Sequence, residues 1–409
     1  MRILHVIPSV SPLRGGPSVM IRVLTRELAK AGLMVDVATT DDNGRGRLSV
    51  MLGQSIVEDG VSYRYFRRQT FFYTFSWPLT RWLALHVADY DLVHIHALFS
   101  YPSISAAFWA WRRRVPYIVR PLGVLTHWSM RHRRPWLKRG SFSLIERRIL
   151  SGAAAVHYTS EQEIREAADL GVRHRAELIP NAVGVPPHTS RKVQGQFREG
   201  HPELANRPLV LFLSRLDQKK GLDLLLHAFA DVIQEHPRAI LAIAGNGEAA
   251  FVETLKQTAA RIGLSRHLIW TGFLAGDDKW AALADADLFV LPSYSENFGI
   301  AVAESLACGV PVVISDQVGI HHEISGSGAG VVVPCDPKPL AKAITRVLAD
   351  ATLRARMAVA ARQCAREQFS LNVMTQKILR LYQEIVAPAL KSFPSQTLVI
   401  DASANETSD

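Results

Sequence analysis

Short apolar runs of strand length alternate with helical patterns in both halves of this 409-residue chain. Apolar runs without polar alternation are typical of parallel strands that helices cover on both faces. The pattern therefore predicts an α/β fold with two Rossmann-like, doubly wound domains. The length agrees, because a domain has roughly 100 to 200 residues and two such domains fit the chain.

Prolines and glycines indicate where these elements begin and end. A first buried strand leads into Gly15-Gly16-Pro17, after which a helix is expected from Ser18 to Lys30, with Gly32 just past its end. Segment 181–208 contains several Pro and Gly residues and is the expected linker between the halves. The polar segment 392–409 is expected to be a disordered tail.

Positive charge is concentrated in the first half of the chain. Residues 1–190 hold 25 Lys and Arg against 14 Asp and Glu, whereas residues 191–409 hold 22 against 23. Such a basic half favours an anionic partner, either nucleic acid or an anionic membrane surface, although solvated arginines give the same count. No run approaches the ~20 apolar residues of a membrane-spanning helix, and the N-terminal apolar run is too short for a signal peptide. Three widely spaced cysteines fit a reducing cytosol.

The segment 293–316 is the most informative part of the sequence. A strand ends before it, a short loop holds Glu296, and a helix is expected to begin near Phe298. The first N–H groups of a helix have no partner within it and carry a partial positive charge, so the amides of 298–300 suit a phosphate. Glu296 and Glu304 lie about 12 Å apart along a helix axis, comparable to the distance from a sugar to a ribose across a diphosphate. One carboxylate can therefore serve a hexose and the other a ribose.

Two upstream loops add cations and glycines. Arg215 follows a buried strand and Lys220 precedes a helix, so both side chains are expected at the sheet edge where ligands bind in open α/β folds. Arg and Lys can offset the charge that develops on a diphosphate leaving group without a metal. Turns at Gly245 and at Gly272-Phe273 follow the next two strands, and each is a weak signal by itself.

These motifs occur in one order across residues 209–335, and their combination resembles the donor site of retaining GT-B glycosyltransferases of family 4, the glycosyl transferases group 1. The first half is similar more loosely, through the loop at Gly15-Gly16. The resemblance implies a GT-B fold, with two Rossmann-like domains that face a central cleft. It implies an acceptor-binding domain over residues 1–185, a nucleotide-sugar donor domain over residues 205–370, and a C-terminal helix over residues 371–388 that packs back on the first domain.

The resemblance also implies a role for each site residue. Glu296 would contact the donor sugar, Glu304 would hold the ribose, and Arg215 with Lys220 would hold the diphosphate. Glu296, Arg215 and Lys220 are therefore the expected catalytic residues. The other expected donor-binding residues are Gly16, Gly245, Gly272, Phe273, Phe298, Gly299 and Ile300. The family needs no metal, and no cofactor is expected, because the nucleotide sugar is a substrate.

The sequence departs from the family at one position. Many relatives have a histidine after the strand that matches 116–121, and that histidine reaches the donor sugar, but Leu122 stands here. Leu122 cannot act as an acid or a base, so no catalytic base is assigned. The leaving phosphate would then take the acceptor proton, as is argued for the family. His94 and His96 lie in an expected strand, where a histidine is more often structural, and the D-x-D at 285–287 fits helix-to-strand packing better than a metal site.

Basic and aromatic residues cluster at 71–82, 109–114 and 128–139. The same mixture suits a membrane interface or a nucleic-acid groove. Beside the donor-site motifs, it favours a lipid-linked acceptor at the cytoplasmic membrane face and no nucleic acid. We therefore expect a cytoplasmic, peripherally membrane-bound enzyme. It would move a hexosyl unit from a nucleotide sugar to a glycan or lipid-linked acceptor, with retention, in cell-surface polysaccharide or lipid-linked glycan assembly.

Two other functions fit parts of the sequence. A nucleotide-sugar isomerase of the 2-epimerase type uses the same scaffold and would convert UDP-GlcNAc without an acceptor. A nucleic-acid-binding module would bind DNA or RNA in a salt-dependent manner and would have no affinity for sugar nucleotides. A dehydrogenase is disfavoured, because no G-x-G-x-x-G follows the first strand.

Overall fold

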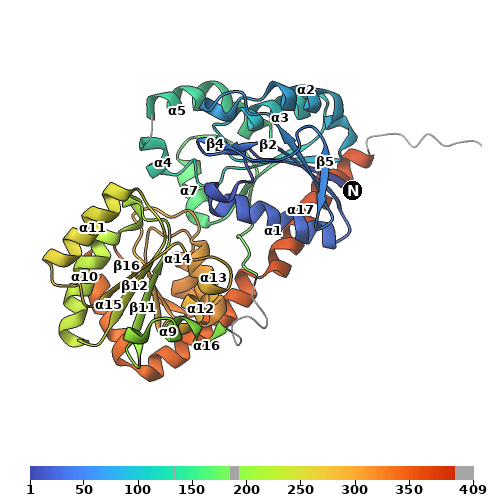
Figure 1. Cartoon of the computed structure of the whole chain (residues 1–409). Helices are drawn as coiled ribbons and strands as arrows, with labels where there is room; N and C mark the ends of the chain where they lie inside the picture. The colour runs from blue at the N-terminus through green and yellow to red at the C-terminus, as the bar shows by residue number, and fades with distance from the viewer. Residues whose placement is uncertain (133–134, 185–192, 392–409) are drawn as a thin grey trace, which may run out of the picture.

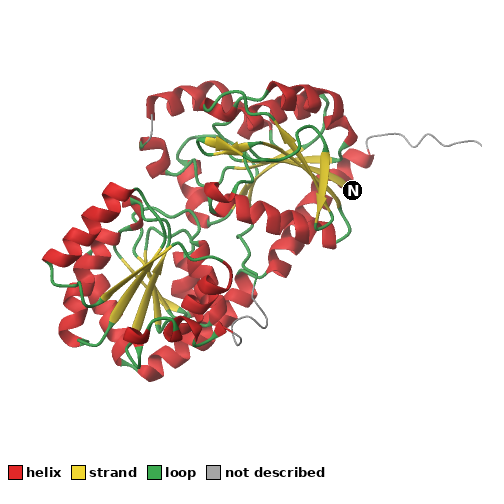
Figure 2. Cartoon of the chain, viewed as in Figure 1, coloured by secondary structure: helices red, strands yellow, loops and turns green. Residues whose placement is uncertain are grey.

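The computed structural model describes residues 1–132, 135–184 and 193–391. These residues form two α/β halves, each built on a parallel sheet with helices on both faces (Figures 1 and 2). The expected tail and residues 185–192 of the expected linker lie outside the described residues. In the part that is described, no helix is both long and apolar enough to cross a bilayer.

The N-terminal half holds an eight-stranded sheet with the order β10-β9-β8-β7-β1-β2-β6-β5. Neighbouring strands are parallel except β5 and β6, which form an antiparallel edge. The strands are β1 (Arg2–Val6), β2 (Met34–Thr40), β5 (Ser55–Glu58), β6 (Val61–Phe66), β7 (Leu92–His96), β8 (Tyr117–Arg120), β9 (Ala155–Tyr158) and β10 (Ala176–Leu178). A separate hairpin pairs β3 (Asp42–Asn43) with β4 (Gly46–Arg47).

Side chains alternate between the two faces of this sheet, so each face has its own core. Along β1, Leu4 and Val6 join one core and Ile3 joins the other. The first face is covered by α2 (Trp77–His86), α3 (Tyr101–Arg112), α4 (His127–Arg131), α6 (Arg147–Gly152) and α7 (Glu161–Ala168), whereas α5 (Pro135–Ser141) contacts α4 and has no buried side chain. The second face is covered by α1 (Gly16–Lys30) and by α17 (Leu371–Lys391), the C-terminal helix, which contacts α1.

The C-terminal half holds a six-stranded, all-parallel sheet with the order β13-β12-β11-β14-β15-β16. The strands are β11 (Leu209–Leu213), β12 (Ile240–Ala244), β13 (Leu268–Gly272), β14 (Leu288–Leu291), β15 (Val312–Ser315) and β16 (Gly330–Val333). The helices are α9 (Gln196–Glu199), α10 (Leu222–Glu235), α11 (Ala249–Arg261), α12 (Gly276–Asp285), α13 (Ile300–Cys308), α14 (His321–Ser327), α15 (Pro337–Ala349) and α16 (Ala351–Gln368).

The strand order reverses between β11 and β14, because β12 and β13 extend the sheet to one side and β15 and β16 extend it to the other. Ligands of open α/β sheets bind outside the carboxyl ends of the strands at such a switch point. The fold therefore places the loops that follow β11 and β14 at the natural binding edge of this half.

The predicted α/β fold with Rossmann-like sheets is confirmed, with small differences at the ends of elements. The first helix begins at Gly16 rather than Ser18, the helix expected near Phe298 begins at Ile300, and the C-terminal helix reaches Lys391. The β5–β6 edge was not predicted, because β5 is largely exposed and lacks a buried apolar run. The domain limits drawn from the sequence stay a prediction.

Candidate functional site

The candidate site lies where β11 and β14 end, at the switch point of the second sheet. The loop after β11 carries Arg215 and leads into the short helix η6 (Gln218–Lys220), and the loop after β14 carries Glu296 and leads into α13. Lys220 and Glu296, which are 76 positions apart in sequence, thus share one edge because β11 and β14 are hydrogen-bonded neighbours.

Lys220 and Glu296 form an ion pair at this edge, with Lys220 Nζ donating to Glu296 Oε2. The Lys220 residue is 5% exposed. Burial acts to raise the pKa of Glu296, but the positive charges of Lys220, Lys219 and Arg215 outweigh it and hold the pKa below its ordinary value. The carboxylate therefore stays ionised at neutral pH, and no partner is recorded for its Oε1 among the described residues.

Two further cations surround the pair. Arg215 is exposed, and its charge reaches both Glu296 and Lys219. Burial, followed by the neighbouring charge of Lys220, lowers the pKa of Lys219. Three basic side chains around one carboxylate leave a net positive edge, which suits a diphosphate.

The loop after Glu296 is held in place by backbone hydrogen bonds and ends at an open helix terminus. The Glu296 N–H donates to the Gln317 carbonyl at 3.0 Å, and the Glu296 carbonyl accepts from the Gly319 N–H at 2.8 Å. Gly299 has φ +94°, and a Cβ there would lie 3.0 Å from Val318. Within the described residues, the N–H groups of 298–300 have no recorded acceptor. Unpartnered N–H groups at the start of a helix such as α13 suit an anion.

Phe298 supports this terminus from beneath rather than lining it. Its side chain is 3% exposed, and its ring packs edge-on against Phe369 with ring centroids 5.5 Å apart. Only its backbone is therefore available to a ligand, as the sequence analysis expected for a phosphate contact.

Glu304 lies on α13, further along the helix, and already has a cation beside it. Lys279 of α12 donates from Nζ to Glu304 Oε1 at 2.6 Å. The ammonium group of Lys279 also lies 4.4 Å from the centre of the Trp280 ring. Lys279 thus fixes one carboxylate oxygen of Glu304 and leaves the other for a ligand.

The glycines of the next two turns have structural reasons of their own. A Cβ on Gly245 would lie 1.8 Å from the Ser214 carbonyl oxygen, and the Gly245 N–H donates to the Gly272 carbonyl at 2.7 Å. Gly245 therefore lets the turn after β12 pack directly on the loop before Arg215. Gly272 has φ +71°, and the Phe273 side chain is 70% exposed at this edge.

The N-terminal half meets the site through the loops that end its own strands. A Cβ on Gly16 would lie 3.0 Å from Ile300 Cδ1, so the start of α1 lies against the start of α13. Leu122 follows β8 with φ +61°, and a Cβ on the next residue, Gly123, would lie 2.6 Å from Asn297. The structure thus brings Gly16 and the Leu122 loop to the same side of the C-terminal half as Ile300 and Asn297.

The histidines of β1 and β7 form a buried layer between the first sheet and α17. His5 and His96 share a hydrogen bond of 2.9 Å, and His94 Nδ1 lies 2.7 Å from the Tyr382 hydroxyl of α17. The three imidazoles are close enough to hold a metal ion, and they take part in hydrogen bonds with one another and with Tyr382. Burial, followed by the charge of Arg120, lowers the pKa of His5 to about 3. They do not belong to the site edge.

The D-x-D of the sequence is used in packing. Asp285 accepts from the N–H groups of Gly195 at 2.6 Å and Arg198 at 3.1 Å. Asp287 accepts from the Arg198 guanidinium at 2.9 Å and from the Leu209 N–H at 2.8 Å. Both carboxylates therefore tie α9 and its surroundings to the second sheet.

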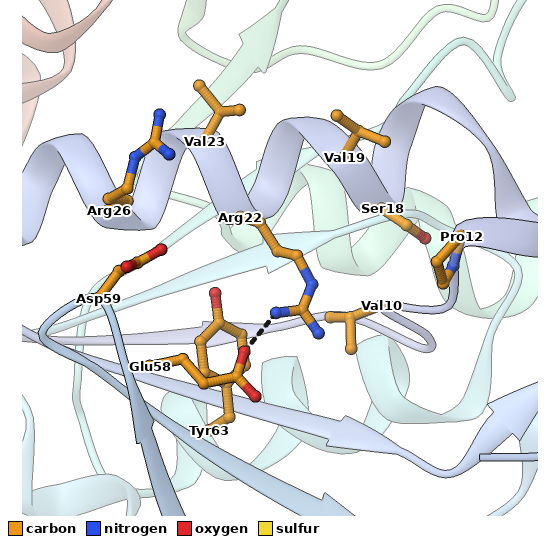
Figure 3. A pocket seen from close by; sticks show the side chains of 10 residues that line it. All are labelled: Val10, Pro12, Ser18, Val19, Arg22, Val23, Arg26, Glu58, Asp59 and Tyr63. Carbon is orange, nitrogen blue, oxygen red and sulfur yellow. Dashed lines mark hydrogen bonds and ion pairs between the residues drawn. The ribbon is translucent and has the colours of Figure 1, made fainter. Parts of the chain in front are cut away.

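A separate cavity of about 250 Å³ lies between α1 and the β5–β6 edge (Figure 3). Arg22 of α1 spans it and pairs with Glu58 at 2.5 Å, with its guanidinium 5.0 Å from the centre of the Tyr63 ring. Arg26 of α1 and Asp59 of the turn between β5 and β6 also line it (Figure 3). The cavity is lined by apolar as well as charged side chains, and α1, which forms one wall, begins against Ile300.

Comparison with known proteins connects both halves to one enzyme family. Residues 15–182 match the family described as glycosyl transferase 4-like domain, and residues 193–364 match glycosyl transferases group 1. A D-inositol 3-phosphate glycosyltransferase of Corynebacterium jeikeium is 26% identical over 94% of this chain and 97% of its own length. A phosphatidyl-myo-inositol mannosyltransferase of Mycobacterium leprae is 30% identical over 76% of this chain and 77% of its own length. Alignments with several other relatives cover about half of each protein.

The chain belongs to the family 4 glycosyltransferases. Solved structures agree on the fold. Sucrose-phosphate synthase from Thermosynechococcus elongatus has a TM-score of 0.76 at 22% identity, over 95% of this chain and all of that chain. HepE of Anabaena in complex with UDP-glucose has a TM-score of 0.73 at 22% identity, over 96% of this chain and all of that chain. The fold of this family 4 glycosyltransferase is GT-B, and the protein is a transferase enzyme.

The sequence analysis missed two groups of residues at the site of this glycosyltransferase. Nothing in the sequence pointed to Lys279, because it lies on a helix without a recognisable motif and its partner Glu304 is 25 positions away. Asn297 stood between two predicted site residues but was passed over, because its partners Thr159 and Ser160 lie in the other half. Thr159 and Ser160 follow the apolar run 153–156, and polar residues at the end of such a run were the available clue.

Proposed function

We propose that this enzyme transfers a hexosyl unit from a nucleotide-sugar donor to a glycan or lipid-linked acceptor, with retention of the anomeric configuration. The Lys220–Glu296 ion pair beside the open terminus of α13 carries the proposal. In it, Oε1 of Glu296 accepts from hydroxyls of the donor sugar, and the amides of 298–300 bind a phosphate. Glu304 takes the ribose hydroxyls on the oxygen that Lys279 leaves open.

The reaction then needs charge stabilisation more than a protein base. The acceptor oxygen forms a bond to the anomeric carbon while the bond from that carbon to the diphosphate oxygen breaks. The proton of the acceptor hydroxyl passes to an oxygen of the leaving phosphate, since Leu122 offers no base. Arg215 and Lys220 offset the charge on the leaving diphosphate, so the step proceeds without a divalent metal.

Exposed aromatic and basic side chains on the N-terminal half support a membrane-bound acceptor. Eight of the large hydrophobic side chains that are exposed lie within 71–144: Phe71, Phe72, Trp77, Leu85, Phe108, Trp111, Trp136 and Leu144. Arg112, Arg131 and Arg139 are exposed among them. Tryptophans beside arginines are suited to the headgroup region of an anionic bilayer. We propose that this surface, 71–144, brings the enzyme to a lipid-linked acceptor.

A thermal-shift screen in EDTA with UDP-glucose and GDP-mannose tests the donor proposal. One of them, at 100 times its dissociation constant, should stabilise the enzyme by about 2.7 kcal/mol. Proton NMR of the transfer product should then show the same anomeric configuration as the donor. Conversion of the sugar nucleotide to a different sugar without any acceptor would instead support an isomerase, and an inverted product would remove retention.

A further inference from the structure

Asn297 joins the two halves of the enzyme at the centre of the proposed donor loop. It stands between Glu296 and the phosphate-binding amides, yet it bonds to residues that follow β9 of the other half. Its side-chain Nδ2 donates to Thr159 Oγ1 at 2.9 Å, and its backbone carbonyl accepts from Ser160 Oγ at 3.0 Å. Both bonds span more than 130 positions of sequence.

Two glycines, one from each half, enclose Asn297. A Cβ on Gly123 would lie 2.6 Å from Asn297 Cγ, and a Cβ on Gly319 would lie 2.0 Å from the Asn297 carbonyl oxygen. Any larger residue at either position would push the loop away. Gly123 and Gly319 therefore allow the two backbones to approach Asn297 closely.

The direction of the hydrogen bonds explains why residue 297 is an asparagine. Glu163, which is 2% exposed, accepts the Thr159 N–H at 3.0 Å and the Thr159 hydroxyl at 3.1 Å, and it accepts the Gly123 N–H at 2.6 Å. A hydroxyl has one proton. Because Thr159 gives its proton to Glu163, its oxygen can only accept from residue 297. An amide satisfies this requirement, whereas a carboxylate would bring two acceptors together.

We propose that Asn297 is a positioning residue, which locks the 296–299 loop to Thr159 and Ser160 and so sets Glu296 toward the acceptor-binding half when the halves close. This inference rests on the proposed function. This contact of Asn297 with Thr159 and Ser160, called the lock below, is suited to repeated opening and closing of the halves. The reason is that the buried Asn297 Oδ1 has no hydrogen-bond partner in the described part of the chain. Separating the halves would return that oxygen to water, which offsets part of the cost of breaking the other two bonds.

Kinetics of Asn297→Asp and Thr159→Val test the proposal. Each should lower kcat by about 10²-fold, the scale of a misplacement by about 1 Å, and leave the KM for the donor within about threefold. Thr159→Ser, which keeps the hydroxyl, should keep kcat within about twofold. Thr254→Val is the matched control, because the Thr254 hydroxyl is exposed on α11 and bonds only to its own helix.

Two further measurements separate this lock from ordinary stabilisation. The double variant Asn297→Ala/Thr159→Val should lose no more kcat than the worse single variant, because both remove one interaction. Small-angle X-ray scattering without ligand should give a larger radius of gyration for Asn297→Asp than for the wild type and Thr254→Val. The proposal would be overturned if kcat and the radius of gyration of Asn297→Asp equalled those of the wild type, or if the kcat losses of the two single variants added up in the double variant. Failure of the wild type to bind UDP or GDP sugars would count against the donor proposal, and the scattering result would still test the lock.

Discussion

Glu296 and Glu304 are both paired with lysines, but the pairs differ in setting. Lys220 is buried beneath Glu296, so the ion pair is fixed by the same backbone that forms the loop. Lys279 reaches Glu304 from a neighbouring helix, and both side chains are partly exposed. The lysine beside Glu296 is therefore the more firmly held of the two, which suits a carboxylate that holds a sugar in one orientation.

This difference predicts distinct effects for the two carboxylates. Glu304→Ala should weaken binding of UDP or GDP by about tenfold to a hundredfold, because a charge-assisted hydrogen bond contributes roughly 1.5 to 3 kcal/mol. Glu296→Gln should leave the affinity for the free nucleoside diphosphate within about threefold while depressing kcat. Calorimetric titrations with the diphosphate and the matching sugar nucleotide check both. Equal losses for the two ligands in Glu296→Gln would contradict its assignment to the sugar.

Residue positions were predictable where a strand end marked them. Arg215, Lys220 and Glu296 follow buried apolar runs, and parallel strands bring such ends to one edge. The partners of Glu304 and Asn297 were not predictable in the same way. Lys279 comes from a helix and Thr159 from the other half, and periodicity along one segment carries no information about which helix or which half packs against it.

At the scale of elements, α17 is held to the first sheet by a polar layer as well as by apolar packing. His5, His94, His96 and His157 are fully or almost fully buried, and the hydroxyl of Tyr382 lies between His94 and His5. Burial, followed by neighbouring positive charge, lowers the pKa of all four imidazoles. The folded protein therefore keeps this layer neutral.

The layer predicts a loss of stability in mild acid. The unfolded chain takes up protons on these histidines near pH 6.5, whereas the folded chain does not, so the unfolded state binds more protons as the pH falls below that value. The free energy of unfolding should drop between pH 6.5 and 5, by up to about 1.4 kcal/mol per pH unit for each histidine. Urea unfolding followed by tryptophan fluorescence reports mainly on the N-terminal half, since six of the eight tryptophans precede residue 185.

Replacing one buried imidazole should reduce this pH slope. His157→Asn removes one proton-binding group from the layer, and His86→Asn is the matched control, because His86 is exposed on α2. The slope should fall by about 1.4 kcal/mol per pH unit at most for His157→Asn. Identical slopes in wild type, His157→Asn and His86→Asn would show that the layer does not control acid stability.

The exposed surface 71–144 predicts binding to anionic vesicles. The enzyme should sediment with vesicles that contain phosphatidylglycerol, be released as salt rises and ignore pure phosphatidylcholine, because salt screens exposed charges beyond a Debye length of about 8 Å. Arg112→Gln/Arg131→Gln/Arg139→Gln should abolish sedimentation while donor affinity stays unchanged. Val359→Ser, on an exposed apolar residue of the other half, is the control. Equal binding to both vesicle types would point to a soluble acceptor.

Arg133 and Arg134 of the predicted basic cluster lie outside the described residues.

For the whole molecule, the sequence predicted two parallel α/β halves because their buried strands are continuous apolar runs. In the structure, α17 packs against α1 and the second face of the first sheet. The contact between the halves could not be predicted, because it depends on loops at strand ends. Gly123, Thr159 and Asn297 meet only once both sheets have formed and faced each other.

The edge formed by Arg215, Lys220 and Glu296 is proposed to hold a nucleotide sugar without a metal. Isothermal titration in EDTA of UDP-glucose and GDP-mannose into the wild type and Arg215→Gln tests this binding, because Arg215 is exposed and its replacement should leave the fold intact. We expect one-site binding of at least one of these donors by the wild type, weakened about tenfold to a hundredfold in Arg215→Gln. Binding that appears only after Mg²⁺ is added, or equal affinity in the two proteins, would contradict it.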